Sequence, residues 1–152
     1  MESGTYKKIM IATDNSALGR KAIETGIVMA KLSGARVYAV YVVASKGFSG
    51  KHPKDVGWEK AMKEHLQAEG KDATAFVAEA GKKEGVEVEP VILEGDPGDA
   101  IVEFAGKNDI DLIVIGTQGK TGVQRFLLGS VAENVVRHSK KAVLVVRGEK
   151  AE

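Results

Sequence analysis

The sequence predicts an α/β fold in which an open, mostly parallel five-stranded sheet is covered by helices on both faces. Five short runs rich in β-branched residues alternate with helical patterns along the 152 residues. Most of these runs are continuously apolar, which is typical of strands buried on both faces of a parallel sheet. Such alternation implies right-handed crossovers between parallel strands. No linker interrupts it, so we expect one domain spanning residues 1–152.

One predicted strand differs from the others in a way that bears on its place in the sheet. The third strand alternates valine with glutamate and contains Pro90. A proline nitrogen cannot donate a hydrogen bond to a neighbouring strand, so we expect this strand at an edge of the sheet. The predicted strands are Lys8–Thr13, Val37–Val43, Val86–Leu93, Leu112–Ile115 and Ala142–Val146.

The first two helices are recognised by their apolar periodicity and by the glycines that follow it. The first has an apolar face that includes Ile23 and Ile27, and we expect it to end near Gly34. Glycine readily adopts the left-handed conformation that closes a helix. The second helix is long, and we expect it to end at Gly81 or Gly85.

The last two helices are recognised by their starts. Asp96-Pro97 combines an N-cap acid with a proline at the first helical position, which predicts the start of the third helix. The fourth helix is expected over about Ser130–His138, between the fourth and fifth strands.

The composition excludes several classes of function. The 22 basic and 21 acidic residues leave a net charge of +1, so we expect no general attraction to nucleic acid or to a membrane surface. The chain contains no cysteine, which excludes disulfides and thiolate metal sites. Its 3 histidines show no zinc-site spacing. Because no apolar stretch resembles a membrane span or a signal peptide, we expect a cytoplasmic protein.

A glycine-rich segment, GTQGKTGVQRFLLGS at residues 116–130, contains the tripeptide Gly119-Lys120-Thr121. The same tripeptide ends the P-loop, Gly-x-x-x-x-Gly-Lys-Ser/Thr, whose backbone surrounds a phosphate. The P-loop also needs a glycine five positions before Gly119, and that position holds Val114, inside a predicted strand. The segment is therefore not a P-loop. The Gly-x-Gly-x-x-Gly fingerprint of dinucleotide sites is also missing from the chain.

The segment nevertheless offers the parts of an anion site: a strand end, a glycine turn, a basic loop and a helix start. Glycines allow backbone N–H groups to approach a bulky anion. A helix N-terminus adds unpaired N–H donors and a partial positive charge. The residues concerned are Gly116, Gly119, Lys120, Arg125, Gly129 and Ser130.

A site without any ligand is the alternative interpretation of this segment. Ser130 and Glu133 have the spacing of a capping box, in which the serine only completes the hydrogen bonding of its own helix. The glycines would then be ordinary turn residues, and the two basic side chains would be solvated. The residues alone leave both interpretations open.

A family resemblance bears on this choice. The stretch GTQGKTGVQRFLLGSVAENVVRHSKKAVLVVR resembles the C-terminal signature of the universal stress proteins, in which Gly-x2-Gly-x9-Gly-Ser/Thr marks the members that bind ATP. KIMIATDNSALGRKAIETGIVMAKLSGARVYAVYVV and EGDPGDAIVEFAGKNDIDLIVIG are also similar to segments of this family, and only about residues 44–83 are generic. The resemblance implies a Rossmann-like sheet with the strand order 3-2-1-4-5.

The resemblance also implies roles for particular residues. The backbone of Ala12 and Val42 would meet the adenine, and Asp14 would approach the ribose or, through Mg²⁺, the phosphates. Asp14, Asn15 and Ser16 are also good N-caps, so capping of the first helix is the alternative role of Asp14. Many members have glycine in place of Asn15, but asparagine tolerates positive φ. Matching phosphate and ribose contacts are Gly116, Gly119, Gly129, Ser130 and Val131, with Lys120 and Arg125 in the basic loop.

The function implied by the resemblance is that of an ATP-binding stress-response sensor or regulatory switch. AMP or ADP are the other nucleotides considered, and Mg²⁺ would accompany the nucleotide. We identify no general base near the expected γ-phosphate, so we expect a binding protein rather than a dedicated ATPase. A slow Mg²⁺-dependent ATPase or phosphotransfer protein, and a dimeric interaction module without nucleotide, are the alternatives. The family also implies a homodimer through Ala142–Val146, because an uncovered apolar edge strand invites pairing.

Overall fold

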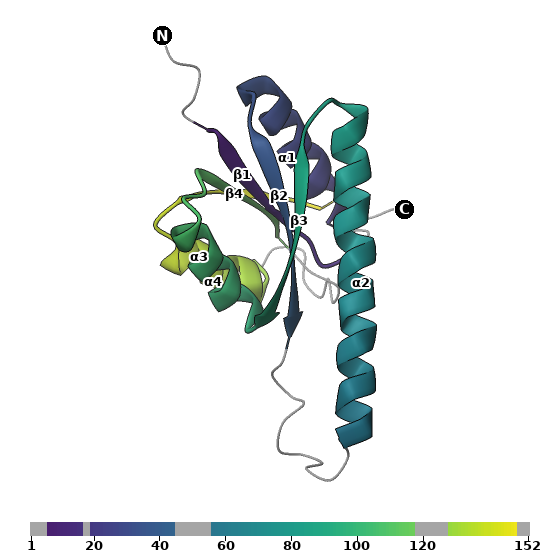
Figure 1. The fold of residues 1–152 in the computed structure, drawn as a ribbon. Helices are drawn as coiled ribbons and strands as arrows, with labels where there is room; N and C mark the ends of the chain where they lie inside the picture. Colours follow the sequence, from purple (N-terminus) through teal and green to yellow (C-terminus); the bar gives the residue numbers. More distant parts are fainter. Residues whose placement is uncertain (1–5, 17–18, 45–55, 118–127, 149–152) are drawn as a thin grey trace.

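The computed structural model describes residues 6–16, 19–44, 56–117 and 128–148, and its elements follow the predicted alternation (Figure 1). Every strand pair is parallel, and the sheet has the order β3-β2-β1-β4-β5. The predicted fold class and strand order are therefore confirmed. Along the chain the elements are β1 (Lys8–Ala12), α1 (Arg20–Ser33), β2 (Arg36–Ala44), α2 (Val56–Lys83), β3 (Val88–Gly95), α3 (Pro97–Lys107), β4 (Leu112–Gly116), α4 (Ser130–His138) and β5 (Ala142–Val146).

The side chains of the sheet alternate between two hydrophobic cores. Ile9 and Ile11 of β1 belong to the core under α1 and α2, whereas Met10 between them belongs to the core under α3 and α4. Figure 1 shows the two pairs of helices on opposite sides of the sheet. The central strands are continuously apolar for this reason, because both of their faces are buried.

The helix ends that the sequence predicted are largely present. Gly34 closes α1 in the left-handed conformation, with φ of 71°. The Asp96 side chain accepts a hydrogen bond from the Asp99 N–H at 3.2 Å, and Pro97 is the first residue of α3. These local motifs are decided within a few residues of the chain, which is why the sequence reveals them.

The start of β3 differs from the prediction, which placed it at Val86. The backbone N–H of Val86 donates to the carbonyl oxygen of Gly81 at 2.8 Å and so completes the end of α2. Pairing with β2 begins only at Val88. Gly85, at φ of 73°, makes the turn between the two elements. Val86 is buried, but it serves the helix end rather than the sheet.

The two edge strands of the sheet have the residues expected at an edge. β3 is one edge, as Pro90 predicted, and the Pro90 side chain is exposed. β5 is the other edge and pairs only with β4. Apart from the exposed Ala142, the residues of β5 are half-buried.

Helix α1 lies unusually close to the sheet at Gly26. A Cβ atom at this position would lie 2.5 Å from Cδ1 and 2.6 Å from Cγ1 of Ile11, and 3.6 Å from Cβ of Val114. Because Ile11 and Val114 are both fully buried in the centre of the sheet, neither has room to withdraw. The glycine therefore allows the helix to rest directly on β1 and β4.

The longest helix, α2, has 28 residues and extends past the end of β2 (Figure 1). None of residues 57–69 is buried, and Gly70 is the next position and is buried. Leu66 of this half packs against Tyr41 and Val43 of β2. None of the helices that the structure describes is long and apolar enough to cross a membrane.

Candidate functional site

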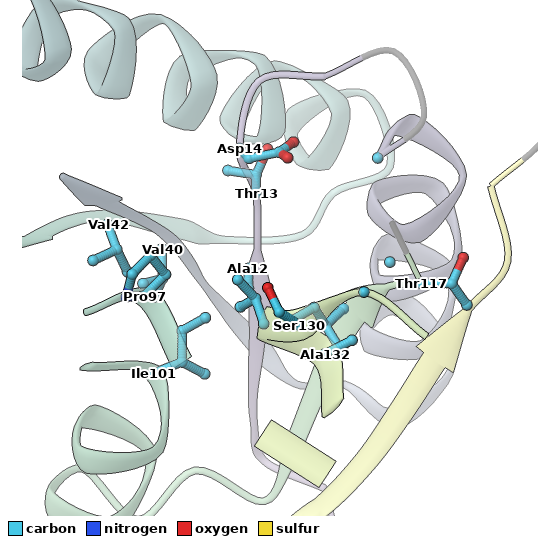
Figure 2. Close-up of a pocket in the computed structure, with 15 residues that line it drawn as sticks. Ala12, Thr13, Asp14, Val40, Val42, Pro97, Ile101, Thr117, Ser130 and Ala132 are labelled. Carbon is cyan, nitrogen blue, oxygen red and sulfur yellow. The ribbon is translucent and has the colours of Figure 1, made fainter. Parts of the chain in front are cut away.

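A cavity of about 330 Å³ opens at the carboxyl edge of the sheet, where β1, β2 and β4 end. In open parallel sheets this edge forms the usual ligand crevice, and the volume is within the range of small-molecule sites. Figure 2 shows its labelled residues. The cavity is lined by Ala12, Thr13, Asp14, Gly19, Val40, Val42, Pro97, Ile101, Ile115, Gly116, Thr117, Gly129, Ser130, Val131 and Ala132.

The turn after β1 places a carboxylate at the mouth of this cavity. Asp14 Oδ1 accepts a hydrogen bond from the backbone N–H of Ser16 at 3.0 Å. Asn15 has φ of 64°, the left-handed conformation that asparagine was expected to tolerate. The Asp14 side chain remains partly exposed and lines the cavity.

The alternative role of Asp14 as an N-cap is wrong. Helix α1 begins at Arg20, and its N-cap is Gly19, without a side-chain hydrogen bond. Asp14 instead stabilises the turn after β1, because its carboxylate accepts a hydrogen bond from the Ser16 N–H, two residues ahead. Ser16 comes closer to the helix, and its Oγ accepts a hydrogen bond from Gly19 N–H at 3.1 Å.

On the opposite side, α4 presents its N-terminus to the cavity. The backbone N–H of Gly129 donates to the carbonyl oxygen of Thr117 at 2.7 Å, which holds the helix start beside the end of β4. The first hydrogen bond of the helix runs from Glu133 N–H to the Gly129 carbonyl oxygen. The N–H groups of the first turn therefore have no partner within the helix, and they lie in the wall of the cavity.

The predicted capping box at Ser130 is not formed. Gly129 is the N-cap and Ser130 is already the first helical residue, so its hydroxyl is one position too far along for capping. Glu133 instead forms an ion pair with Arg137 at 2.9 Å. The exposed Ser130 side chain makes no hydrogen bond among the described residues and borders the cavity.

The remaining wall is apolar and comes from β2, α3 and α4. Val40 and Val42 project from the same face of β2 because they are two positions apart. Pro97 and Ile101 of α3 are one helical turn apart and lie beside them in Figure 2. An apolar slot next to unpaired donors suits a ligand with a flat apolar part and an anionic part.

The electrostatic surroundings of Asp14 extend behind β2. Tyr41 is buried, and its hydroxyl donates to Glu69 Oε2 of α2 at 2.7 Å. Burial, this hydrogen bond and the negative charges of Glu69 and Asp14 raise the pKa of Tyr41 above its usual range. The Tyr41 hydroxyl is therefore neutral at physiological pH.

The structure brings most of the predicted site residues together in this one cavity. They are Ala12, Asp14, Val42, Gly116, Gly129, Ser130 and Val131. The predicted residues Gly119, Lys120 and Arg125 lie outside the described residues.

Several lining residues were not predicted from the sequence. Thr13 and Thr117 directly follow strands, and Val40 shares a face with Val42, so strand periodicity could have indicated them. Pro97 and Ile101 carry no such signal. They belong to a helix that follows the edge strand β3, and only the packing of α3 across the sheet brings them to the cavity.

Asp14 is the one carboxylate among the described lining residues. Within the described part of the chain, no group of three or more histidine, cysteine, aspartate or glutamate residues could hold a metal. A single carboxylate is sufficient for Mg²⁺ that is also held by the phosphates of a nucleotide. The donor set thus fits a cation that arrives with its ligand.

Comparison with known proteins agrees with this picture. Residues 5–147 match the model of the universal stress protein family. The chain is 46% identical to Universal stress protein MJ0531 of Methanocaldococcus jannaschii over 147 residues, which cover 97% of this chain and 85% of the relative. The structure of protein MJ0577 has a TM-score of 0.83 at 30% identity and covers 97% of this chain and 99% of that chain.

Another similar structure contains a nucleotide. The universal stress protein from Archaeoglobus fulgidus in complex with dAMP has a TM-score of 0.70 at 27% identity. The match covers 93% of this chain and 98% of that chain. With a family match over almost its whole length and a relative of 46% identity, the chain belongs to the universal stress protein family.

Proposed function

We propose that this protein binds ATP in the cavity at the carboxyl edge of the sheet and acts as a nucleotide-dependent regulatory switch. The observation that carries the proposal is the combination of an apolar slot, a helix N-terminus with unpaired donors and a carboxylate around one cavity. The adenine would lie between β2 and α3, near the backbone of Ala12 and Val42. The phosphates would face Gly129 and Ser130 at the N-terminus of α4.

The complex of a structural neighbour with dAMP supports an adenine nucleotide. The Ser130 hydroxyl supports a ligand at the helix start, because it makes no cap there and no hydrogen bond to the residues that the structure describes. Asp14 would repel the phosphates directly, so it would act through Mg²⁺ or on the ribose. Gly119, Lys120 and Arg125 are included in the proposed site on the basis of the sequence alone.

Titration calorimetry tests the proposal directly. We expect ATP with Mg²⁺ to bind with a dissociation constant well below roughly 1 mM, the upper end of typical metabolite concentrations. GTP should bind more weakly. ADP and AMP in the same series would rank the adenine nucleotides. Absence of binding for all of them at several millimolar would reject the proposal.

The chemistry of the described lining residues favours a regulatory role over catalysis. Apart from Asp14, the described lining residues offer no group that could act as a general base. A site of this kind can retain ATP and respond to its concentration without fast turnover. Slow Mg²⁺-dependent hydrolysis is the second candidate, because Asp14 could hold the cation.

Replacing Asp14 with alanine distinguishes these roles. If Asp14 acts through Mg²⁺, we expect the affinity for ATP to fall roughly tenfold with Mg²⁺ present and to change little without it. The exposed Asp72 of α2 gives a matched control, Asp72→Ala, which should bind as the wild type does. Steady ADP release by the wild type that Asp14→Ala abolishes would favour the hydrolase. Equal loss with and without Mg²⁺ would indicate the ribose as its target.

We also propose a homodimer through β5. This strand is an edge of the sheet, and its half-buried apolar side chains would gain burial from pairing with a second copy. Sedimentation should give twice the chain mass of 16.1 kDa. Val145→Lys should shift the protein towards monomer, whereas Val28→Lys on the exposed face of α1 should not. A dimer that binds no nucleotide would favour the interaction module instead.

A further inference from the structure

Two helices that wall the cavity, α3 and α4, are joined by a contact that does not itself line the cavity. Pro97 and Ile101 come from α3, and Val131 and Ala132 come from α4. Besides the apolar core that the helices share, Asn134, one turn after Ser130 on α4, contacts the start of α3. The spacing of these two helices therefore sets the distance between parts of the cavity wall.

Asn134 packs tightly against the first turn of α3. A Cβ atom at Gly98 would lie 2.5 Å from Asn134 Nδ2, 2.7 Å from Cγ and 2.8 Å from Cβ. Gly98 is buried and directly follows Pro97. The absence of a side chain at Gly98 thus allows Asn134 to reach the backbone of α3 beside a wall residue.

Hydrogen bonds fix the Asn134 side chain in this position. Its Nδ2 donates to Asp99 Oδ1 of α3 at 3.1 Å. Its Oδ1 accepts a hydrogen bond from His138 Nδ1, 2.8 Å away, so this ring nitrogen carries the proton. With both ends of the amide engaged, the side chain is held in one orientation between α3 and the end of α4.

We infer that Asn134 is a positioning residue that sets the separation of α3 and α4, and through it the affinity of the cavity for its nucleotide. Asn134 does not touch the ligand. Its contact with Gly98 and its hydrogen bond to Asp99 hold the wall residues Pro97 and Ile101 at a fixed distance from the N-terminus of α4. This inference rests on the proposed nucleotide site.

The amide allows a nearly isosteric test. Asn134→Asp keeps the shape but places a carboxylate against Asp99, and repulsion should separate the helices. We expect nucleotide affinity to fall roughly fivefold to tenfold. Adding Asp99→Asn to Asn134→Asp exchanges the amide and the carboxylate between the two helices. The amide at position 99 can then donate a hydrogen bond to the carboxylate at position 134. We expect the double variant to regain the wild-type affinity within about twofold.

Three controls separate positioning from charge and from general destabilisation. Asp99→Asn alone keeps an acceptor for Asn134 and should bind normally. Asn134→Ala removes the contact without adding charge and should still weaken binding. Asn108→Asp makes the same chemical change at the far end of α3, where the amide donates to the Phe104 carbonyl oxygen at 2.9 Å. It should leave affinity unchanged.

A second measurement does not depend on any nucleotide. The chain has no cysteine, so Glu103→Cys in α3 and Arg137→Cys in α4 provide unique spin-label sites on side chains that are 69% and 68% exposed. We expect the distance between the labels to lengthen or broaden in Asn134→Asp and to return in the double variant. If the wild type binds no adenine nucleotide, the proposed function fails while this distance still tests the positioning. An unchanged distance, or an altered distance with unchanged affinity, would overturn the inference.

Discussion

Replacing Gly129 with valine is expected to weaken ATP binding by about 100-fold or more. Gly129 lines the cavity at the N-cap of α4, where the proposed phosphates would approach the backbone. A branched side chain there would occupy the space that an anion needs to reach the unpaired N–H groups of Ser130 and Val131. Calorimetry at several millimolar ATP measures the loss.

The same substitution should leave the fold intact. Gly129 has φ of −63° and ψ of 156°, an extended conformation that valine adopts readily. Its N–H, which bonds to Thr117, is kept. We expect a loss of no more than about 1 kcal/mol of unfolding free energy, the usual effect of a poor N-cap residue. Normal ATP binding by a folded Gly129→Val variant would show that the nucleotide does not use this helix N-terminus.

Replacing Gly26 with valine is expected to have the largest effect on stability. The added Cβ would overlap Ile11, and the two methyl groups beyond it would press further on β1 and β4. Overpacking a fully buried contact of this kind costs about 3 kcal/mol. For a chain of this length that corresponds to a decrease of roughly 10 °C in the melting temperature. A thermal melt followed by circular dichroism measures it.

Gly106 provides the control for both glycine substitutions. It lies in α3, and a Cβ atom there would meet no other atom within 4 Å. Gly106→Val should therefore leave the affinity for ATP unchanged, and it should shift the melting temperature by no more than about 2 °C. If Gly26→Val melts as this control does, then α1 has room to move away from the sheet, contrary to the packing at Ile11.

The sequence was sufficient for the fold because its signals are local and repeated. Continuously apolar strands, the Asp96-Pro97 start and Gly34 each depend on neighbouring residues, and the structure confirms them. Pro90 correctly placed β3 at an edge, since a missing donor is visible in the residue itself. The strand bounds differ from the prediction by up to two residues, and the start of β3 shifted because the end of α2 engages the Val86 N–H.

The same local reasoning offered cap roles, as alternatives to ligand binding, for two polar side chains of the candidate site, and the structure shows neither. Ser130 and Glu133 have capping-box spacing, yet the helix begins one residue earlier than that motif needs, with Gly129 as its N-cap. Asp14 is a good cap by type, but α1 begins only at Arg20, after Gly19. In both cases residue type is compatible with two positions, and the path of the backbone decides between them.

The part of the apolar wall that α3 contributes could not be predicted, because it is made by packing. Pro97 and Ile101 reach the cavity only because α3 packs across the sheet beside α4. Where the two helices meet, Gly98 lies against Asn134, and neither residue has a ligand-binding character of its own. Spatial neighbours of this kind leave no trace in sequence spacing.

The overhang of α2 gives this helix two levels of local stability. Beyond Gly70 the helix rests on the sheet, with Ala73, Thr74 and Val77 buried. Before it, the helix is held by half-buried residues such as Leu66, by the hydrogen bond from Tyr41 to Glu69 and by the exposed ion pair of Lys63 with Glu94. Fraying of the first turns therefore exposes almost no core and costs little free energy. We therefore expect the amide hydrogens of the first turns to exchange with solvent faster than those of the part of α2 that packs on the sheet.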